Sequence, residues 1–492
     1  MDLAQELHAC LKNLFAPGAV EIREPAGRTT PATPLSWEVR GATDKPLLHL
    51  WAENCNVTRR VLAIADQSDS RLSLSVERFG RAAPERLDIV RLDFPPNPKQ
   101  VSRQDFCEQL RRILAEQFPD ETLEKLSIAA DLEHTLSRIF ARGVTRKGQT
   151  RGAFLAVPER ETQDAIESSL TYALLWLERA RQFAGRPNGW FLRLIVPQGK
   201  ATLLVHQLAA LDPRLAIQIY ELNSQSETME RVDPCANGNI QSWLVPLREC
   251  QLLLDRAKDD LAPIIATAPE AICAHPIPRD HEVLLRFRGL PFARWRDGRI
   301  DFAAGSLWQE LRPRTEHELH QLILNLKNFR NPVASALRHP LYRAQPERWM
   351  QTIVIQDLSR VDILLSPQHV YEQVIAKSHG QHGILDLLAV TNTKRLAILE
   401  LKAGENPELP LQAADYWDRI RRLHAQGDLA RYGYFAGLQL QPDPPIVYLL
   451  APALRFHPTT ETILRYLSPE LQVIRLGLAE NWRRGLRVVM RQ

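Results

Sequence analysis

Two short apolar segments in the last quarter of the chain constrain its fold most. Residues 383–390 and 395–402 are rich in branched apolar side chains, and the polar stretch 391–394 separates them. Short apolar runs bounded by turn-forming residues favour strands over helices. We therefore predict that the two segments pair as a β-hairpin inside a buried sheet.

Acidic residues interrupt both segments of this hairpin. Side chains alternate between the two faces of a strand, so Glu400 and Lys402 point the same way. If Val390 pairs with Leu396, Asp386 lies directly opposite Glu400, with Cβ atoms about 5 Å apart. Buried carboxylates at that separation repel each other unless a cation lies between them, and hard oxygen ligands suit Mg²⁺.

The expected site suits hydrolysis of a phosphodiester bond. A divalent ion held by Asp386, Glu400 and the backbone carbonyl of Leu401 would supply a metal-bound hydroxide and a counter-charge for the phosphate oxygens. Lys402 would hold or help to deprotonate the attacking water. The ordinary alternative is a surface hairpin with a solvated Glu/Lys pair. The apolar neighbours of Glu400 argue against that alternative.

These residues resemble the PD-(D/E)xK nuclease superfamily. Asp386 is similar to its second acidic motif and Glu400-Leu401-Lys402 to its (D/E)xK motif, although Leu385 stands where the proline of the name would be. The resemblance spans about residues 335–492. It implies a restriction-endonuclease-like mixed sheet flanked by helices, and Mg²⁺ as cofactor with Mn²⁺ able to substitute.

A helix after the (D/E)xK segment extends the resemblance. Pro410 suits the first turn of a helix, and Gln412 and Tyr416, four residues apart, share one face of it, which Arg419 continues. A Gln-x-x-x-Tyr helix at this place resembles the RecB-type branch of the superfamily. That resemblance implies substrate contacts for Gln412, Tyr416 and Arg419. The alternative is an amphipathic helix whose tyrosine packs at the sheet edge.

The superfamily usually has one more acidic residue, on a helix before the first core strand. The helix predicted to begin at Pro346 offers Glu347 as a further metal ligand and catalytic residue, whereas Asp357 and Asp362 lie past its expected end and Glu372 lies in the next strand. The alternative for Glu347 is an acid of the first turn, stabilised by the helix dipole.

The composition of the chain limits its class, its location and its partners. The 492 residues are 45% hydrophobic and 24% charged, which is ordinary for a globular protein. The six cysteines form no Cys-x-x-Cys pair, so we expect reduced thiols and a cytoplasmic location. No apolar run approaches the length of a membrane span, so no membrane association is expected. The net charge of +4 is compatible with a nucleic-acid partner.

The chain is long enough for several domains in an overall α/β (α+β) architecture. We predict an α+β domain over 1–130 and an α/β domain over 131–275, with a βαβ-like unit in the second. A connector over 276–334 is expected to pair residues 282–288 with 299–303 as a hairpin, followed by a helix at 316–329. The nuclease-like domain follows over 335–492. Residues 1–275 present no clustered catalytic set, so they are assigned to substrate selection, partner docking or self-association.

The leading hypothesis is a Mg²⁺-dependent deoxyribonuclease, with DNA favoured over RNA as its partner. One alternative is an inactive nuclease fold that binds nucleic acid or serves as a scaffold. Another is a nuclease specific for RNA. Endonuclease and exonuclease action both remain open at this point.

Overall fold

The protein is described by a computed structural model, in which the chain divides into two compact units, Met1–Ser102 and Arg103–Gln492. The described residues are 2–15, 19–24, 27–29, 35–41, 43–52, 55–68, 71–77, 84–92, 103–128, 136, 139–183, 189–234, 243–303, 308–372, 374–376 and 385–492.

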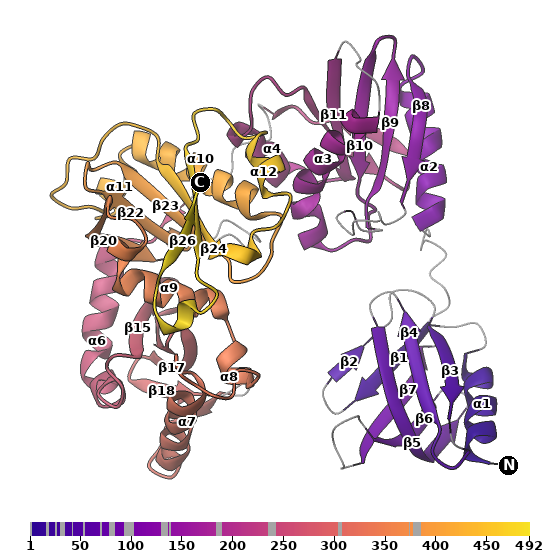
Figure 1. The fold of residues 1–492 in the computed structure, drawn as a ribbon, viewed down its shortest axis with the longest axis horizontal. Helices are drawn as coiled ribbons and strands as arrows, with labels where there is room; N and C mark the ends of the chain where they lie inside the picture. Colours follow the sequence, from indigo (N-terminus) through magenta and orange to yellow (C-terminus); the bar gives the residue numbers. More distant parts are fainter. Residues whose placement is uncertain are drawn as a thin grey trace. The chain divides into compact units, whose positions relative to one another are not determined.

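The first unit is an antiparallel sheet covered by one helix (Figure 1). Among its described residues, seven strands run in the order β2-β1-β7-β6-β5-β4-β3. The elements are α1 (Leu3–Leu14), β1 (Ala19–Glu24), β2 (Gly27–Thr29), β3 (Ser36–Arg40), β4 (Leu47–Ala52), β5 (Cys55–Ser68), β6 (Arg71–Glu77) and β7 (Glu85–Leu92). Asp2 caps α1 by accepting a hydrogen bond from the N–H of Gln5. The apolar face of α1, with Leu7 and Leu11, then packs on the sheet.

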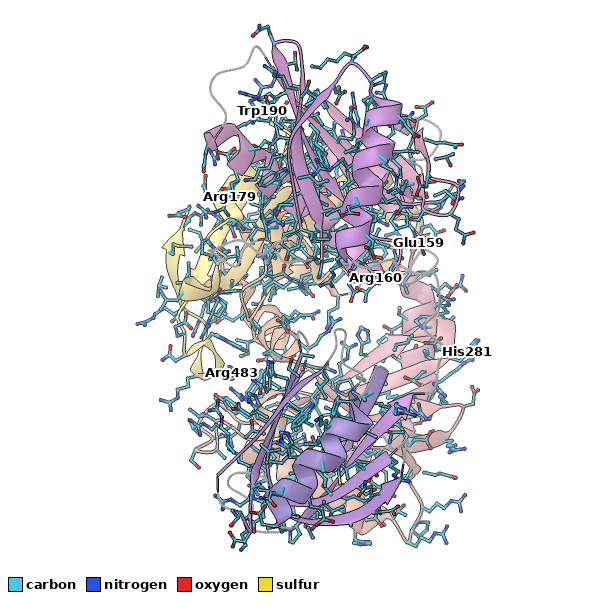
Figure 2. The ribbon with its side chains drawn as sticks, turned by 90° about the vertical axis from the view of Figure 1, so that its right-hand side faces the viewer. Glu159, Arg160, Arg179, Trp190, His281 and Arg483 are labelled. Carbon is cyan, nitrogen blue, oxygen red and sulfur yellow. The ribbon has the colours of Figure 1, made fainter. Side chains whose placement is uncertain are left out.

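The second unit begins with a mixed sheet of six strands, in the order β13-β12-β11-β10-β9-β8. Its elements are α2 (Arg103–Gln117), β8 (Thr122–Ser127), β9 (Ala141–Lys147), β10 (Thr150–Ala156), α3 (Gln163–Phe183), β11 (Gly189–Pro197), α4 (Thr202–Gln207), β12 (Ile217–Asn223) and β13 (Thr228–Arg231). Strands β10, β11 and β12 are parallel, so the predicted βαβ unit is confirmed. Helix α3 packs along β10 and β11. Figure 2 labels Arg179 of α3 and Trp190 of β11.

The boundary between the two units differs from the predicted end of the first domain at residue 130. Helix α2 buries Leu110 and Ile113 against Phe154 of β10 and Ile195 of β11. Strand β8 pairs with β9 in the same sheet. Both elements therefore belong to the second unit, and the division falls at Ser102.

A second sheet of this unit is a five-stranded antiparallel meander, β15 to β19, packed against α6 and α7. Its elements are α6 (Leu247–Ile265), β15 (Ile272–Ile277), β16 (Glu282–Phe287), β17 (Leu290–Arg296), β18 (Arg299–Phe302), β19 (Gln309–Glu310) and α7 (Glu316–Phe329). The predicted pairing of 282–288 with 299–303 is wrong, because β17 lies between β16 and β18. Two-residue turns allow this, since Gly289 and Gly298 have positive φ angles that suit tight hairpins. Helix α7 matches the prediction.

The C-terminal sheet is mixed and carries helices on both faces (Figure 1). Its strand order is β20-β22-β23-β24-β25-β26, in which β23, β24 and β25 are parallel. The elements are α9 (Pro346–Gln356), β20 (Leu365–Glu372), β22 (Leu387–Thr391), β23 (Leu396–Leu401), α10 (Leu409–Ala425), β24 (Ile446–Pro452), α12 (Thr460–Leu464), β25 (Val473–Leu478) and β26 (Val488–Arg491). Val390 pairs with Leu396, so the predicted hairpin and its register are confirmed.

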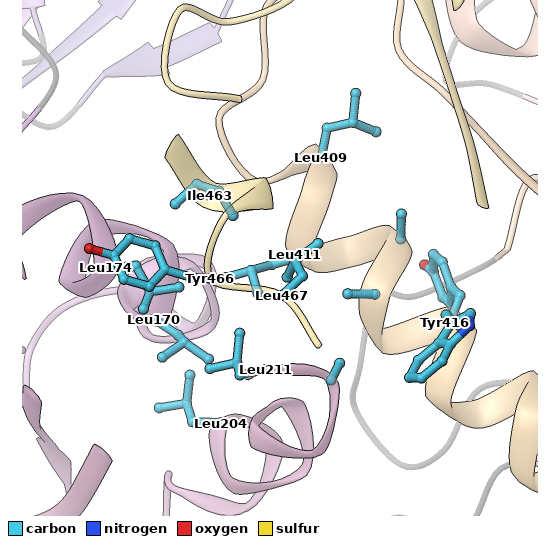
Figure 3. Packing of buried hydrophobic residues seen from close by; sticks show 14 of the residues in the cluster. Leu170, Leu174, Leu204, Leu211, Leu409, Leu411, Tyr416, Ile463, Tyr466 and Leu467 are labelled. Carbon is cyan, nitrogen blue, oxygen red and sulfur yellow. The ribbon is translucent and has the colours of Figure 1, made fainter. Parts of the chain in front are cut away.

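The two faces of this sheet pack against different helices. Leu387 and Leu399 face α9 with its buried Trp349 and Met350. Leu388 and Ile398 on the opposite face pack against α10. The α10 cluster continues through Leu411 to Leu170 and Leu174 of α3 and to Leu204 of α4 (Figure 3). Helix α10 is thus covered on both sides.

The α/β fold class and the helix-flanked mixed sheet within residues 335–492 are confirmed. The segment 372–386 between β20 and β22 is described only in part, and the two-residue strand β21 (Ile375–Ala376) pairs there with β14 (Trp243–Leu244). Across the described ranges, we find no helix with the length and apolar character needed to cross a membrane.

Candidate active site

The open end of the β22–β23 hairpin brings the two predicted carboxylates together. Leu387 pairs with Leu399, so Asp386, one residue before β22, lies opposite Glu400. The backbone N–H of Leu401 donates a hydrogen bond to Oδ2 of Asp386 at 2.9 Å. Asp386 and Glu400 share the sheet face that carries Leu388 and packs on α10. The structure therefore brings together the predicted Asp and Glu-x-Lys residues.

Glu400 is buried in this arrangement, with only 2% of its surface exposed. Its Oε1 lies 3.8 Å from Nζ of Lys402, an ion-pair distance. Its Oε2 is buried and has no hydrogen-bond partner among the described residues. Buried polar atoms are normally satisfied, so an orphaned carboxylate oxygen needs an explanation. The side chain of Lys402 is 22% exposed and is therefore more open than that of Glu400.

Burial and repulsion by a neighbouring carboxylate act on both acidic groups, from Glu347 on Asp386 and from Asp386 on Glu400. Burial raises the pKa of Asp386, although the Leu401 N–H and the charge of Lys402 oppose that effect. Burial and then the neighbouring charge of Asp386 raise the pKa of Glu400 well above its usual range. Lys402 and Arg348 favour ionisation of both carboxyls. The positive charges near the site therefore do not fully compensate two ionised carboxylates.

Glu347 reaches the same end of the hairpin from α9. Pro346 lies in the first turn of the helix, as predicted. Oε1 of Glu347 accepts a hydrogen bond from the backbone N–H of Ala403 at 3.2 Å. Its charge is close enough to contribute to the raised pKa of Asp386. Glu347 therefore lies at the rim of the carboxylate pair with one oxygen engaged by a peptide group.

Tyr416 of α10 lies beside the carboxylate pair. It is 6% exposed and belongs to the α10 cluster (Figure 3). Burial, followed by the charge of Glu400, raises the pKa of Tyr416 strongly. Gln412, one turn earlier, has a buried Oε1 without a hydrogen-bond partner in the described part of the chain. These two residues were predicted to lie near the site, and their helix faces it.

Arg419 has partners inside the protein. It is 7% exposed, and its Nε donates to Oδ2 of Asp415 at 2.8 Å. Oδ1 of Asp415 lies 3.2 Å from Nε2 of His206 on α4. Burial would raise the pKa of Asp415, but His206 and Arg419 hold it below its usual range. These contacts give Arg419 a stabilising role between α10 and α4, and none of them supports the predicted substrate contact.

The acidic side chains around Glu400 match the ligands that a divalent ion prefers only in part. The described residues contain no group of three or more Asp, Glu, His or Cys side chains arranged to hold a metal ion. Two carboxylates do converge, and one oxygen of Glu400 is unsatisfied. Mg²⁺ commonly binds one or two carboxylates and takes its other ligands from water and substrate phosphate. The residues present fit that mode of binding and do not fit a cage made only of side chains.

A polar network surrounds Gln351 of α9, which the sequence interpretation did not include. Its Nε2 donates to the backbone carbonyl of Asp386 at 3.1 Å and to Oε2 of Glu372 at 3.2 Å. Its Oε1 accepts from Nη1 of Arg348 at 2.8 Å. Nη1 of Arg286 on β16 also donates to Oε2 of Glu372, at 3.3 Å. One signal was visible beforehand: Gln351 is four residues after Glu347, on the same helix face.

Comparisons with known proteins find no match at the sequence level. No family model matches the chain, and no curated protein matches it. Two solved structures of endonucleases align with 44% of the chain. One is a repair endonuclease from Pyrococcus abyssi, at 13% identity over 93% of that chain with a TM-score of 0.17. The other is an EndoMS–dsDNA complex, at 11% identity over 90% of that chain with a TM-score of 0.20. Likeness at this level carries no argument about activity.

Proposed function

We propose that this protein is a divalent-metal-dependent nuclease that hydrolyses phosphodiester bonds in DNA, with a site of the PD-(D/E)xK type. The observation that supports it most is the facing pair of carboxylates, half-buried Asp386 and buried Glu400, with Lys402 beside them. A structural ion pair would need only one acid for one lysine. Two acids beside one lysine, with one oxygen unsatisfied, favour a bound cation.

Asp386, Glu400 and the backbone carbonyl of Leu401 would hold the metal, with Mg²⁺ favoured and Mn²⁺ able to replace it. Bound there, the ion would lower the pKa of a coordinated water and neutralise charge on the phosphate. Glu347, held by the N–H of Ala403, adds negative charge at the rim of this site. A substrate phosphate and water would complete the coordination.

Lys402 would act on the nucleophile. Its side chain is partly exposed while its ammonium lies 3.8 Å from Oε1 of Glu400, so it faces both the carboxylates and solvent. An ammonium at this place orients the attacking water and stabilises negative charge that develops on the phosphate. The carboxylates keep Lys402 close to the site by charge attraction.

Tyr416 and Gln412 would contact the substrate or its bound water. The raised pKa of Tyr416 keeps its hydroxyl protonated at neutral pH, so that it can donate a hydrogen bond to a phosphate oxygen. Gln412 carries an unsatisfied carbonyl oxygen on the same face of α10, which suits it to accept a hydrogen bond from water. These roles follow the RecB-type resemblance of the Gln-x-x-x-Tyr helix.

The test is a substrate panel of linear, circular and single-stranded DNA and of RNA, each with Mg²⁺, Mn²⁺ or EDTA. We expect DNA cleavage with either metal ion and none with EDTA. Lys402→Ala should lower the rate by at least about 100-fold. The matched control is Lys394→Ala, which changes the exposed lysine in the turn of the same hairpin and should leave the rate intact.

Each other outcome has a definite meaning. Full activity in Lys402→Ala would refute the assigned site. Cleavage of RNA alone would replace the proposal by an RNA-specific nuclease. Binding of DNA without cleavage of any substrate would favour the inactive, nucleic-acid-binding alternative.

A further inference from the structure

Helix α9 holds the open end of the catalytic hairpin at two points, one helical turn apart. Glu347 accepts a hydrogen bond from the N–H of Ala403, which follows β23. Gln351 donates one to the carbonyl of Asp386, which precedes β22. Residues four apart lie on one face of a helix, so a single face of α9 contacts both strands. The spacing of the two strand ends is therefore coupled to the position of α9.

The amide of Gln351 has no freedom to turn. The residue is 2% exposed, and its Oε1 is occupied by Nη1 of Arg348 at 2.8 Å. Its Nε2 divides its two hydrogens between the Asp386 carbonyl and Oε2 of Glu372. Rotating the amide by half a turn would bring its nitrogen against Arg348 and its oxygen against two acceptors. A buried polar group satisfied on every side specifies one geometry.

Glu372 in turn is fixed by the five-stranded sheet. Nη1 of Arg286 donates to its Oε2, and Nδ1 of His275 lies 3.8 Å from the same oxygen. The β16–β17 turn also touches α9 directly, because a Cβ added at Gly289 would lie 2.3 Å from the carbonyl oxygen of Arg348. The meander thus supports α9 through both a side chain and its backbone.

We propose that Gln351 is a positioning residue that fixes the backbone of Asp386 relative to Glu400 and thereby sets the affinity of the site for a divalent ion. This inference rests on the proposed function, because it concerns the same carboxylate pair. Groups that orient metal ligands typically contribute about 10- to 100-fold in metal affinity or activity. Gln351 acts through Asp386 and touches neither metal nor substrate in this scheme.

The experiment is a titration of the full-length protein with Mn²⁺ alone, followed by electron paramagnetic resonance. Gln351→Met keeps the side-chain volume and removes all three hydrogen bonds. We expect it to weaken Mn²⁺ binding by about 10- to 100-fold. Gln356→Met is the matched control, since Gln356 is exposed at the end of the same helix and should bind Mn²⁺ as the wild type does. In DNA cleavage, Gln351→Met should lower kcat and leave KM for DNA unchanged.

The outcomes separate the two proposals. If the wild type binds no Mn²⁺, the proposed function fails. If the wild type binds and Gln351→Met binds equally well, only the positioning role is refuted. Should Gln351→Met fail to fold, Gln351→Asn decides, because its shorter amide stays polar but does not reach the Asp386 carbonyl. Unchanged Mn²⁺ affinity in the folded Gln351→Asn protein would overturn the inference, and weakened affinity would support it.

Discussion

The carboxylate of Asp386 accepts a hydrogen bond from the backbone N–H of Leu401, although Leu401 ends β23 and Asp386 precedes the neighbouring strand β22. A side chain thus closes the hairpin at the point where the strand ladder ends. A substitution at Asp386 therefore alters hydrogen bonding and charge together. Glu400 also interacts with the backbone of Asp386, but its Oε2 has no hydrogen-bond partner within the described residues, so a substitution there disturbs less hydrogen bonding.

Glu400→Gln should separate the effect of charge from that of metal binding. In EDTA we expect the variant to be more stable than the wild type by about 1–3 kcal/mol, because a neutral amide removes a buried charge that lies opposite Asp386. Excess Mg²⁺ should raise the melting temperature of the wild type but not of Glu400→Gln, since only a ligand that binds the folded state stabilises it. Thermal unfolding with and without Mg²⁺ measures both effects. An equal Mg²⁺ shift in the two proteins would exclude Glu400 as a ligand.

Asp362 predicts a pH dependence of stability. Its carboxylate accepts hydrogen bonds from the N–H of Leu364 and the hydroxyl of Tyr448, and it pairs with Arg491 at 2.8 Å. Burial would raise the pKa of Asp362, but these partners hold it below its usual range. A lowered pKa in the folded state means that the stabilisation is complete above the unfolded value of about 3.9 and is lost as the pH falls below it.

Asp362→Asn should therefore lower the free energy of unfolding by about 3 kcal/mol at pH 7. The difference in unfolding free energy between wild type and variant should narrow as the pH falls below about 4. Urea unfolding at several pH values measures this difference in the free energy of unfolding. Asp443→Asn, at an exposed position, is the control. A gap that stays constant with pH would show that the charge of Asp362 contributes nothing.

Two glycines at equivalent turn positions separate backbone strain from a steric contact. Gly289 and Gly298 have φ angles of +81° and +85°, but only Gly289 has neighbours where a Cβ would lie. Gly298→Ala should lower the free energy of unfolding by about 1–2 kcal/mol, because alanine is strained in the left-handed backbone conformation. Gly289→Ala should lower the free energy of unfolding by about 2 kcal/mol more, because its Cβ would clash with the backbone of Arg348. Chemical denaturation of the two variants measures the difference, and equal losses would mean that the meander does not pack tightly on α9.

Arg419→Met should affect stability and leave DNA binding nearly unchanged. Removing its guanidinium leaves Asp415 buried with less compensation, which typically costs about 3–5 kcal/mol. The exposed Arg431 offers a control, and Arg431→Met should change stability by less than about 0.5 kcal/mol. Urea unfolding and a DNA-binding titration distinguish the two roles. A large loss of DNA affinity without loss of stability would restore the substrate contact expected from the resemblance.

The β22–β23 hairpin was predictable because the sequence pattern that sets its register is local. The alternation of buried residues fixes the register of a strand pair, and a slip by one residue would move every side chain to the wrong face. Asp386 and Glu400 could therefore be placed opposite each other from their spacing to Val390 and Leu396. The Glu347 helix followed from Pro346 by the same local logic.

The supporting network was not predictable in this way. Arg286 and Glu372 are separated by 86 residues, and nothing near either position marks the other as its partner. The partner of Arg419 on its own helix, Asp415, was visible at the i, i+4 spacing, whereas His206 was not. Strand β17 was missed because Pro291 and two arginines interrupt its apolar pattern, while tight turns at its ends hold it in the sheet.

The position of α10 between two layers makes the proposed active site depend on residues far back in the chain. Leu411 and Tyr416 share one hydrophobic cluster with Leu174 of α3 and Leu204 of α4. A fragment that begins at residue 335 would lack α3 and α4. The side of α10 that packs against them would then be exposed to solvent. The shortest fragment with the proposed nuclease activity should accordingly start no later than α2, and a looser contact at Leu174 should slow the proposed cleavage.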